Sequence, residues 1–138
     1  MKVLIDTNVI LDVLIKREPH FKSSASFLKL CPTKVEGLIA ASQTTDIFYI
    51  LQREGKNAVD SKALIKKLTD KIKVIDVTAA DVKNAIDSDM RDYEDALLAF
   101  GGKRHNVDYI VTRNKNDFRD APVPAISPVE FLKQLLTT

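Results

Sequence analysis

The sequence predicts an α/β protein, a three-layer α/β/α sandwich with a parallel sheet of about five strands and helices on both faces. Short apolar runs alternate with longer amphipathic segments along the chain, and this alternation is typical of parallel sheets. The apolar runs are uninterrupted, as in residues 3–5, which is typical of strands covered on both faces. We expect residues 1–138 to form a single domain, because this length allows one core of ordinary size.

Composition narrows the class of protein. Hydrophobic residues make up 45% of the chain and charged residues 29%, which is typical of a globular rather than a disordered protein. The formal net charge of +2 neither requires nor excludes a nucleic-acid partner. Cys31 is the only cysteine, and no segment resembles a signal sequence or a membrane span. We therefore expect a soluble cytoplasmic protein without disulfides.

The first half of the chain contains two predicted strands and four predicted helices. The strands are the apolar runs at residues 3–5 and 35–40. The helices cover residues 9–15, 21–30, 42–51 and 58–69. Thr7 or Asn8 is the expected cap of the first helix and Ser42 that of the third, because small polar side chains stabilise helix starts.

The second half contains three predicted strands and three predicted helices. The strands cover residues 72–77, 109–112 and 123–126, and the helices cover residues 79–87, 92–105 and 129–136. Thr78 and Ser127 are the expected caps, and Pro128 follows Ser127 in the order that helices prefer. Gly101 and Gly102 interrupt a helical pattern, so we expect close backbone packing there.

Acidic residues follow the predicted strands. Asp6 comes directly after the first strand, Asp46 lies one turn into the helix after the second, and Asp117 follows the fourth. Asp92 and Asp95 are three residues apart and so share one helix face. The carboxyl ends of parallel strands meet at one edge of the sheet, where ligands bind. Carboxylates that converge there repel one another and bind hard cations, so the sequence predicts a Mg²⁺ or Mn²⁺ site.

Four segments together resemble the motifs of the PIN domain family. They are DTNVILD from Asp6, ASQTTDI from Ala41, DYEDAL from Asp92 and YIVTRNKNDF from Tyr109. None is specific alone, but four in this order, each in its expected strand or helix context, are specific together. The resemblance implies a Mg²⁺- or Mn²⁺-dependent ribonuclease that leaves 5′-phosphate and 3′-hydroxyl ends. Many such proteins are VapC-type toxins of toxin–antitoxin pairs, so an antitoxin partner is implied as well.

The resemblance also implies a role for each acidic residue. Asp6 and Asp95 would bind the metal ion directly, and Asn114 or Asp117 would complete its coordination. Asp46 would position the attacking water, so the implied catalytic residues are Asp6, Asp46, Asp95 and Asp117. Two positions depart from the family pattern, since Asp46 replaces a longer Glu and Asn114 replaces an Asp found in many members. These departures predict a weaker metal site or one that prefers Mn²⁺.

Further residues are expected to support the acids or to bind substrate. Four residues would orient the carboxylates or lie just behind them: Thr7, Asp12, Asp92 and Thr112. Of these, Asp92 fits equally well as a helix cap. Three cations near the same edge would bind the phosphates of single-stranded RNA: Arg17, Arg113 and Lys115. An exposed apolar helix face would serve a homodimer or a partner helix.

Two alternatives stay open on the sequence. A non-catalytic RNA-binding or interaction module with a degenerate metal site would accommodate both Asp46 and Asn114. An unrelated acid-cluster phosphatase or phospho-acceptor receiver fits less well. Asn8 stands where a haloacid-dehalogenase-like phosphatase would carry its second Asp, and residues 124–127 lack the Lys that a receiver needs. RNA binding without cleavage would identify the first alternative.

Overall fold

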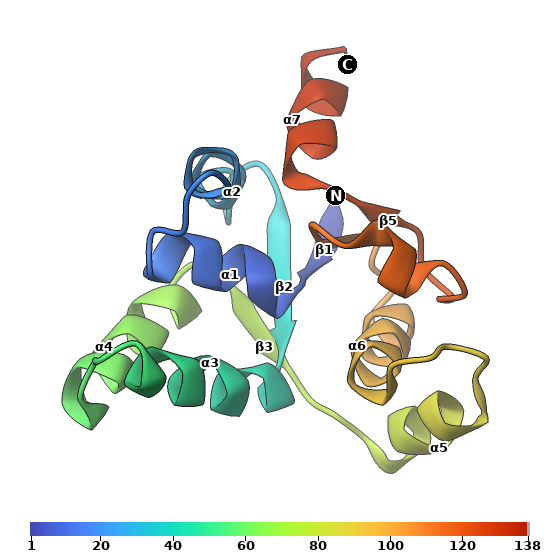
Figure 1. Cartoon of the computed structure of the whole chain (residues 1–138). Coiled ribbons are helices and arrows are strands. Elements are labelled where there is room, and N and C mark those ends of the chain that lie inside the picture. Colours follow the sequence, from blue (N-terminus) through green and yellow to red (C-terminus); the bar gives the residue numbers. More distant parts are fainter. Residues whose placement is uncertain (138) are drawn as a thin grey trace.

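Five parallel strands form the middle layer of the molecule. A computed structural model describes residues 1–137. The strands are β1 (Lys2–Ile5), β2 (Glu36–Ala40), β3 (Lys73–Ile75), β4 (Tyr109–Val111) and β5 (Ala125–Ile126). Their order is β3-β2-β1-β4-β5, and every neighbouring pair is parallel (Figure 1). The predicted three-layer α/β/α fold is thereby confirmed.

The strand order places a crevice beside β1. Val3 of β1 is in register with Gly37 of β2 on one side and with Tyr109 of β4 on the other. The chain builds outward from β1 to β3 and then returns to the opposite side of β1 as β4. In such sheets the connections after the two central strands leave in opposite directions, which opens a crevice at the carboxyl edge. The segments after β1 and β4 therefore line the natural site for a ligand.

Helices cover both faces of this sheet. Within residues 1–137 they are α1 (Thr7–Leu14), α2 (Phe21–Leu28), α3 (Ala41–Arg53), α4 (Ala58–Thr69), α5 (Ala79–Asp87), α6 (Tyr93–Arg104), the 3₁₀ helix η1 (Lys115–Phe118) and α7 (Pro128–Leu136). Helices α1 to α4 lie on one side of the sheet, and α5 and α6 lie on the other (Figure 1). Along residues 1–137, no helix combines the length and the apolar character that crossing a membrane requires.

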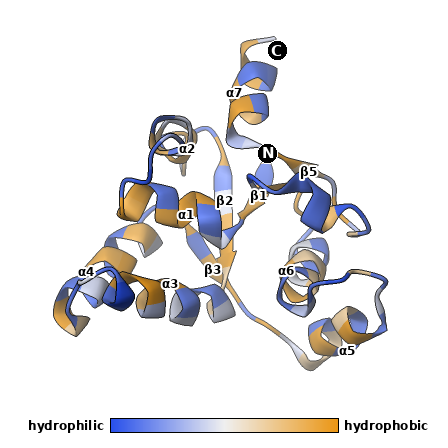
Figure 2. Ribbon diagram, in the orientation of Figure 1, coloured by the Kyte–Doolittle hydropathy of each residue, from blue (hydrophilic) through white to orange (hydrophobic). Residues whose placement is uncertain are grey.

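Each face of the sheet has its own core. Val3 and Ile5 point into the core shared with α1 to α4 and α7, whereas Leu4 points into the core shared with α5 and α6. All three side chains are fully buried, as the uninterrupted apolar run predicts. The helices carry both hydrophobic and hydrophilic stretches (Figure 2), as expected of helices with one face on a sheet.

Gly102 of α6 packs closely against this sheet, as expected. A Cβ atom at position 102 would lie 3.0 Å from Val107 Cγ2 and 3.3 Å from Leu4 Cδ2. Gly101 has more room, because its Cβ would be 3.8 Å from the nearest atom, Asp81 Oδ2. The close approach of α6 to β1 therefore depends on Gly102.

The helix starts differ from the predicted ones. Asp6, rather than Thr7 or Asn8, is the N-cap of α1, and its side chain accepts a hydrogen bond from the Thr7 amide. Ser42 does not cap α3, because that helix begins at Ala41. The Thr78 and Ser127 caps are confirmed. Strands β3 and β5 are shorter than predicted, since flanking apolar residues lie outside the hydrogen-bonded ladder.

Candidate active site

Asp6 is fixed at the carboxyl end of β1. Its Oδ1 accepts a hydrogen bond from the Thr7 amide at 2.8 Å. Its Oδ2 accepts one from Thr112 Oγ1 at 2.8 Å and one from Asn8 Nδ2 at 3.1 Å. Because β1 and β4 are neighbours, Thr112 reaches Asp6 across the sheet edge although 106 residues separate them. Asp6 thus presents a buried, preoriented carboxylate.

Asp95 brings a second carboxylate to the same place. Asp92 is the N-cap of α6, and its Oδ1 accepts a hydrogen bond from the Asp95 amide at 2.9 Å. Partial burial raises the pKa of Asp95 to about 7, and the charges of Asp6, Asp92, Asp117 and Glu94 add to this effect. The site therefore opposes a further negative charge, which a bound cation would relieve.

The pKa of Asp6 is raised as well. Burial is the main cause, and the charge of Asp117 contributes to it. Hydrogen bonds from Thr112 and Thr7, and the charge of Arg113, act in the opposite direction. The charge of Asp117 raises the pKa of both Asp6 and Asp95, so acids from three different segments of the chain act on one another.

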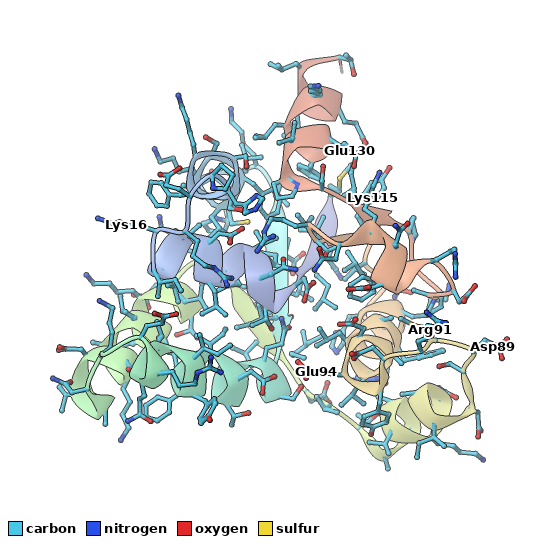
Figure 3. All side chains as sticks on the ribbon, in the orientation of Figure 1. Lys16, Asp89, Arg91, Glu94, Lys115 and Glu130 are labelled. Carbon is cyan, nitrogen blue, oxygen red and sulfur yellow. The ribbon has the colours of Figure 1, made fainter. Side chains whose placement is uncertain are left out.

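Glu94 is a site residue that sequence reasoning missed. It follows the Asp92 cap in the first turn of α6, and Figure 3 shows it at the end of α6 that faces α3. Burial raises the pKa of Glu94, and so do a hydrogen bond with Asp46 and the charge of that carboxylate. Asp46, on α3, therefore meets Glu94 from across the crevice. The available signal was the position of Glu94 in the DYED segment, next to Asp95.

Gln43 is a second residue that the sequence analysis did not identify. Its Nε2 donates to the Ile5 carbonyl at 2.8 Å and to Thr7 Oγ1 at 3.2 Å. Its Oε1 accepts a hydrogen bond from the Ala40 amide at 2.7 Å. This buried side chain joins the ends of β1 and β2 to the start of α1. Its signal was a Gln at the third position of a helix, where such a side chain reaches back to the N-cap.

The segment after β4 carries Asn114 and Asp117. The Asn114 amide donates to Thr112 Oγ1 at 3.0 Å, and both Asn114 and Asp117 line an open depression of about 520 Å³. Lys115, expected to bind RNA, is ion-paired with Glu130 at 2.9 Å (Figure 3). This pair and hydrogen bonds from Ser127 lower the pKa of Glu130 to about 2.

Arg17 and Arg113, the other expected RNA-binding cations, meet at Asp12. Arg113 donates from Nε to Asp12 Oδ2 at 2.8 Å and from a terminal nitrogen to Oδ1 at 3.2 Å. Arg17 Nε lies 3.3 Å from the same Oδ1, and Ser24 Oγ donates to Oδ2 at 3.0 Å. The Asp12 side chain is fully buried. These two arginines therefore balance an internal charge.

The metal-binding capacity of the site rests on its donor chemistry. We define the acidic cluster as Asp6, Asp46, Asp92, Glu94, Asp95 and Asp117. Across residues 1–137, no three Asp, Glu, His or Cys side chains converge closely enough to hold one metal ion. The donors are nonetheless all oxygens, and the buried Asn8 Oδ1, next to Asp6, has no hydrogen-bond partner in that range. A group of oxygen donors that repel one another suits a hard divalent cation. The acidic cluster therefore has the right donor chemistry for such an ion, although its side chains are too far apart to hold one as they stand.

A parallel sheet with an acidic cluster at its central crevice defines a class of α/β proteins suited to divalent-cation chemistry. This chain belongs to the PIN domain family, whose profile matches residues 2–116. PIN domain ribonucleases generally use divalent metal ions. The expected family resemblance is thereby confirmed, and membership argues against the phosphatase and receiver alternatives.

Several known proteins are similar to this chain. Ribonuclease VapC1 of Aquifex aeolicus (strain VF5) is 26% identical over 139 residues, which span 96% of this chain and 94% of that protein. VapBC2 from Rickettsia felis, bound to a DNA fragment from its promoter, contains a chain with a TM-score of 0.70 at 17% identity. That match covers 92% of this chain and 98% of the other. VapBC-1 from nontypeable Haemophilus influenzae matches with a TM-score of 0.70 at 15% identity, covering 94% and 99%.

Proposed function

We propose that this protein is a divalent-metal-dependent ribonuclease that cleaves single-stranded RNA and acts as the toxin of a toxin–antitoxin pair. The observation that carries the proposal is the acidic cluster around Asp6 and Asp95 at the central crevice of a PIN domain fold. Similarity to Ribonuclease VapC1 and to chains of VapBC structures supports the activity and the biological class.

Four residues would hold the cofactor: Asp6, Asp95, Asp117 and Asn114. The cofactor, Mg²⁺ or Mn²⁺, would supply acidified water and positive charge for the phosphate. Thr112, Thr7 and Asn8 keep Asp6 in one orientation by donating to both of its oxygens. Asp92 holds the first turn of α6, and so keeps Asp95 directed at the crevice. Rigid support of this kind is what positions reacting groups in an enzyme.

Asp46 is the proposed proton acceptor. A water molecule attacks the phosphorus, Asp46 takes up its proton, and the bond from phosphorus to the 3′ oxygen breaks. The products are a 5′-phosphate and a 3′-hydroxyl, which takes its proton from solvent. Glu94 interacts with Asp46, which raises the pKa of Glu94, so Glu94 can share the proton.

RNA cleavage tests the proposal directly. A mixed single-stranded RNA pool is incubated with the protein in Mg²⁺, in Mn²⁺ and in EDTA, and the ends of the products are mapped. We expect metal-dependent cleavage that leaves 5′-phosphates and disappears in the Asp6→Asn, Asp95→Asn double variant. Asp89→Asn is the matched control, because Asp89 is exposed and lies on the loop before α6, outside the acidic cluster.

The second candidate is an RNA-binding module without catalytic activity. The open geometry of the acidic cluster in residues 1–137 favours it, as does the neutral Asn114. Folded, partner-free protein that binds RNA but cuts none with either metal would establish this function in place of the nuclease.

An antitoxin partner is also part of the proposal. An apolar groove of about 530 Å³ lies between α1, α2 and α4, lined by Leu14, Phe21, Leu28 and Leu64 and edged by three lysines and one acid: Lys29, Lys67, Lys71 and Asp70. An amphipathic segment with acidic flanks would complement it. Co-expression with a candidate antitoxin should yield a complex that Leu64→Glu weakens, whereas unchanged binding would place the partner elsewhere.

We further infer a homodimer and a cytoplasmic location. Tyr49 on α3 and Val59 on α4 are 62% and 76% exposed, and such apolar side chains are suited to a contact between copies. A cytoplasmic location agrees with an RNA substrate and with a single, buried cysteine. Light scattering of the purified protein measures the oligomeric state.

A further inference from the structure

Within residues 1–137, two arginines differ from the others because their guanidinium groups have no partner. Arg17 and Arg113 contact Asp12, Arg104 contacts Asp76 and Asp81, and Arg53 lies over the Tyr49 ring. For the guanidinium groups of Arg91 and Arg119, the described part of the chain provides no hydrogen bond or ion pair. Both residues are exposed, and guanidinium groups bind phosphates strongly, so these two are available to a ligand.

Both arginines line one pocket. The pocket has a volume of about 270 Å³ and lies between the loop before α6 and the segment that contains η1. Its lining residues are Met90, Arg91, Asp92, Asn116, Asp117, Arg119 and Asp120. Figure 3 shows Arg91 on the loop between α5 and α6. Because Asp92 and Asp117 belong to the acidic cluster, the pocket opens directly beside the candidate active site.

The acidic cluster cannot by itself attract RNA, since its carboxylates repel phosphate groups. The cations expected from the sequence to do so are already paired within the chain, Arg17 and Arg113 with the buried Asp12 and Lys115 with Glu130 at the surface. Arg91 and Arg119 are the arginines left available next to the cluster. Arginine offers the planar, two-pronged donor geometry that a phosphate accepts. A small pocket also suits one nucleotide unit better than a duplex.

We propose that the Arg91–Arg119 pocket binds a phosphate of single-stranded RNA next to the one that is cleaved. Asn116, on the same wall, supplies an amide that can donate to the sugar or base of that nucleotide. The proposal rests on the proposed ribonuclease function, because it identifies how that site holds its substrate. It assigns to these two arginines the binding of the RNA backbone, and to the acidic cluster the chemistry.

The test is RNA binding without cleavage. A fluorescent single-stranded RNA of mixed sequence is titrated with protein in EDTA at several salt concentrations. We expect Arg91→Gln, Arg119→Gln to weaken binding at least roughly tenfold and to reduce the slope of log K against log salt by about 0.7, the value for one lost phosphate contact. The control Lys62→Gln, Lys66→Gln removes the same charge from exposed positions of α4 and should change both quantities much less.

A further variant and a folding control keep the result interpretable. Arg91→Lys, Arg119→Lys retains the charge, so it should restore most of the salt slope while binding more weakly than wild type. Thermal unfolding of each variant shows that it is folded. If Lys62→Gln, Lys66→Gln loses as much RNA affinity as Arg91→Gln, Arg119→Gln, the pocket proposal is wrong, since diffuse charge alone would explain both losses.

Failure of the pocket can be distinguished from failure of the nuclease. If the wild type cleaves RNA and the glutamine variant binds like wild type, the pocket proposal is wrong and the ribonuclease proposal stands. If the wild type cleaves nothing but its binding depends on Arg91 and Arg119, the pocket is retained in an RNA-binding protein without catalytic activity.

Discussion

At the scale of a single residue, the charge of Asp95 is unfavourable for stability but suited to function. Its carboxyl group is partly buried and surrounded by four other acids, and its pKa is raised to about 7. Its negative charge therefore destabilises the folded protein when no cation is present. Residues that are unfavourable for stability in this way are typical of functional sites.

Replacing Asp95 should therefore stabilise the metal-free protein. We expect Asp95→Asn to raise the free energy of unfolding in EDTA at pH 7.5 by roughly 1 kcal/mol, a value reduced for solvent screening of this half-exposed group. Urea titration measures it. The control Asp89→Asn removes an exposed charge outside the cluster and should have little effect.

The same variant should respond less to metal ions. A cation that binds only the folded state raises the melting temperature, so Mg²⁺ or Mn²⁺ should raise that of the wild type more than that of Asp95→Asn. Equal increases in both proteins would contradict a role for Asp95 in holding the ion. This measurement does not depend on activity.

The residues of the site could be predicted to the extent that they follow strand ends. Asp6 and Asp117 come after buried apolar runs, and parallel strands bring such positions together. Glu94 could not be separated from an ordinary acid in the first turn of a helix, where the helix dipole favours negative charge. The occupation of Arg113 and Arg17 by Asp12 could not be predicted, because it depends on how three distant segments meet.

At the scale of elements, the two adjacent glycines of α6 should respond differently to substitution by alanine. Gly102→Ala should destabilise the protein by roughly 1–3 kcal/mol, because its Cβ would press on Val107 and Leu4. Gly101→Ala should be neutral or stabilising by up to about 1 kcal/mol, since alanine favours helices and its Cβ has room. Thermal unfolding of the pair measures the difference. The opposite order would mean that α6 does not approach β1 as described.

Helices α5 and α6 are joined through Arg104. Its guanidinium donates to Asp81 in the first turn of α5 and to Asp76 after β3. Burial would raise the pKa of Asp81, but hydrogen bonds from Arg104 and Thr78 outweigh it and lower the pKa. Hydrogen bonds from Arg104 and His105 also lower the pKa of Asp76.

This network should stabilise the protein in a pH-dependent way. A carboxyl group with a lowered pKa in the folded state stabilises fully above its unfolded value, about 3.9, and loses that contribution as the pH falls below it. We therefore expect Arg104→Gln to lower the melting temperature clearly at pH 7, with a smaller difference from wild type at pH 3. The control Arg53→Gln, which removes only a contact with Tyr49, should show no such pH dependence.

The order and type of the elements could be predicted, whereas several of their ends could not. Periodicity identifies a helix or an apolar strand, but a helix start depends on which side chain reaches the free amides. Asp6 caps α1 because the β1 strand ends there and directs the carboxylate back over the first turn. The short helix η1 was not predicted, since four polar and aromatic residues give no helical period.

At the scale of the whole molecule, Asp12 joins three parts of the chain. It lies on α1 and contacts Arg17 after α1, Ser24 on α2 and Arg113 after β4. We expect Asp12→Ala to lower the free energy of unfolding by roughly 2–3 kcal/mol, because partly exposed arginines would be left beside a buried space. Ser24→Ala should cost about 1 kcal/mol, the value of one hydrogen bond. Urea denaturation measures both, and equal effects would argue against Asp12 as the centre of the contact.

The pairing of β1 with β4 affects when the site can form during synthesis. During synthesis the N-terminal segments emerge first, so β1 can pair with β2 while its other side waits for Tyr109–Val111. Until then Asp6 lacks the hydroxyl of Thr112, and Asp117 of η1 has not yet been translated. If the proposed activity is correct, the nascent chain on the ribosome has no ribonuclease activity before β4 and η1 are made. The active enzyme would form only after β4 and η1 have been made, which gives an antitoxin the time of their synthesis in which to bind.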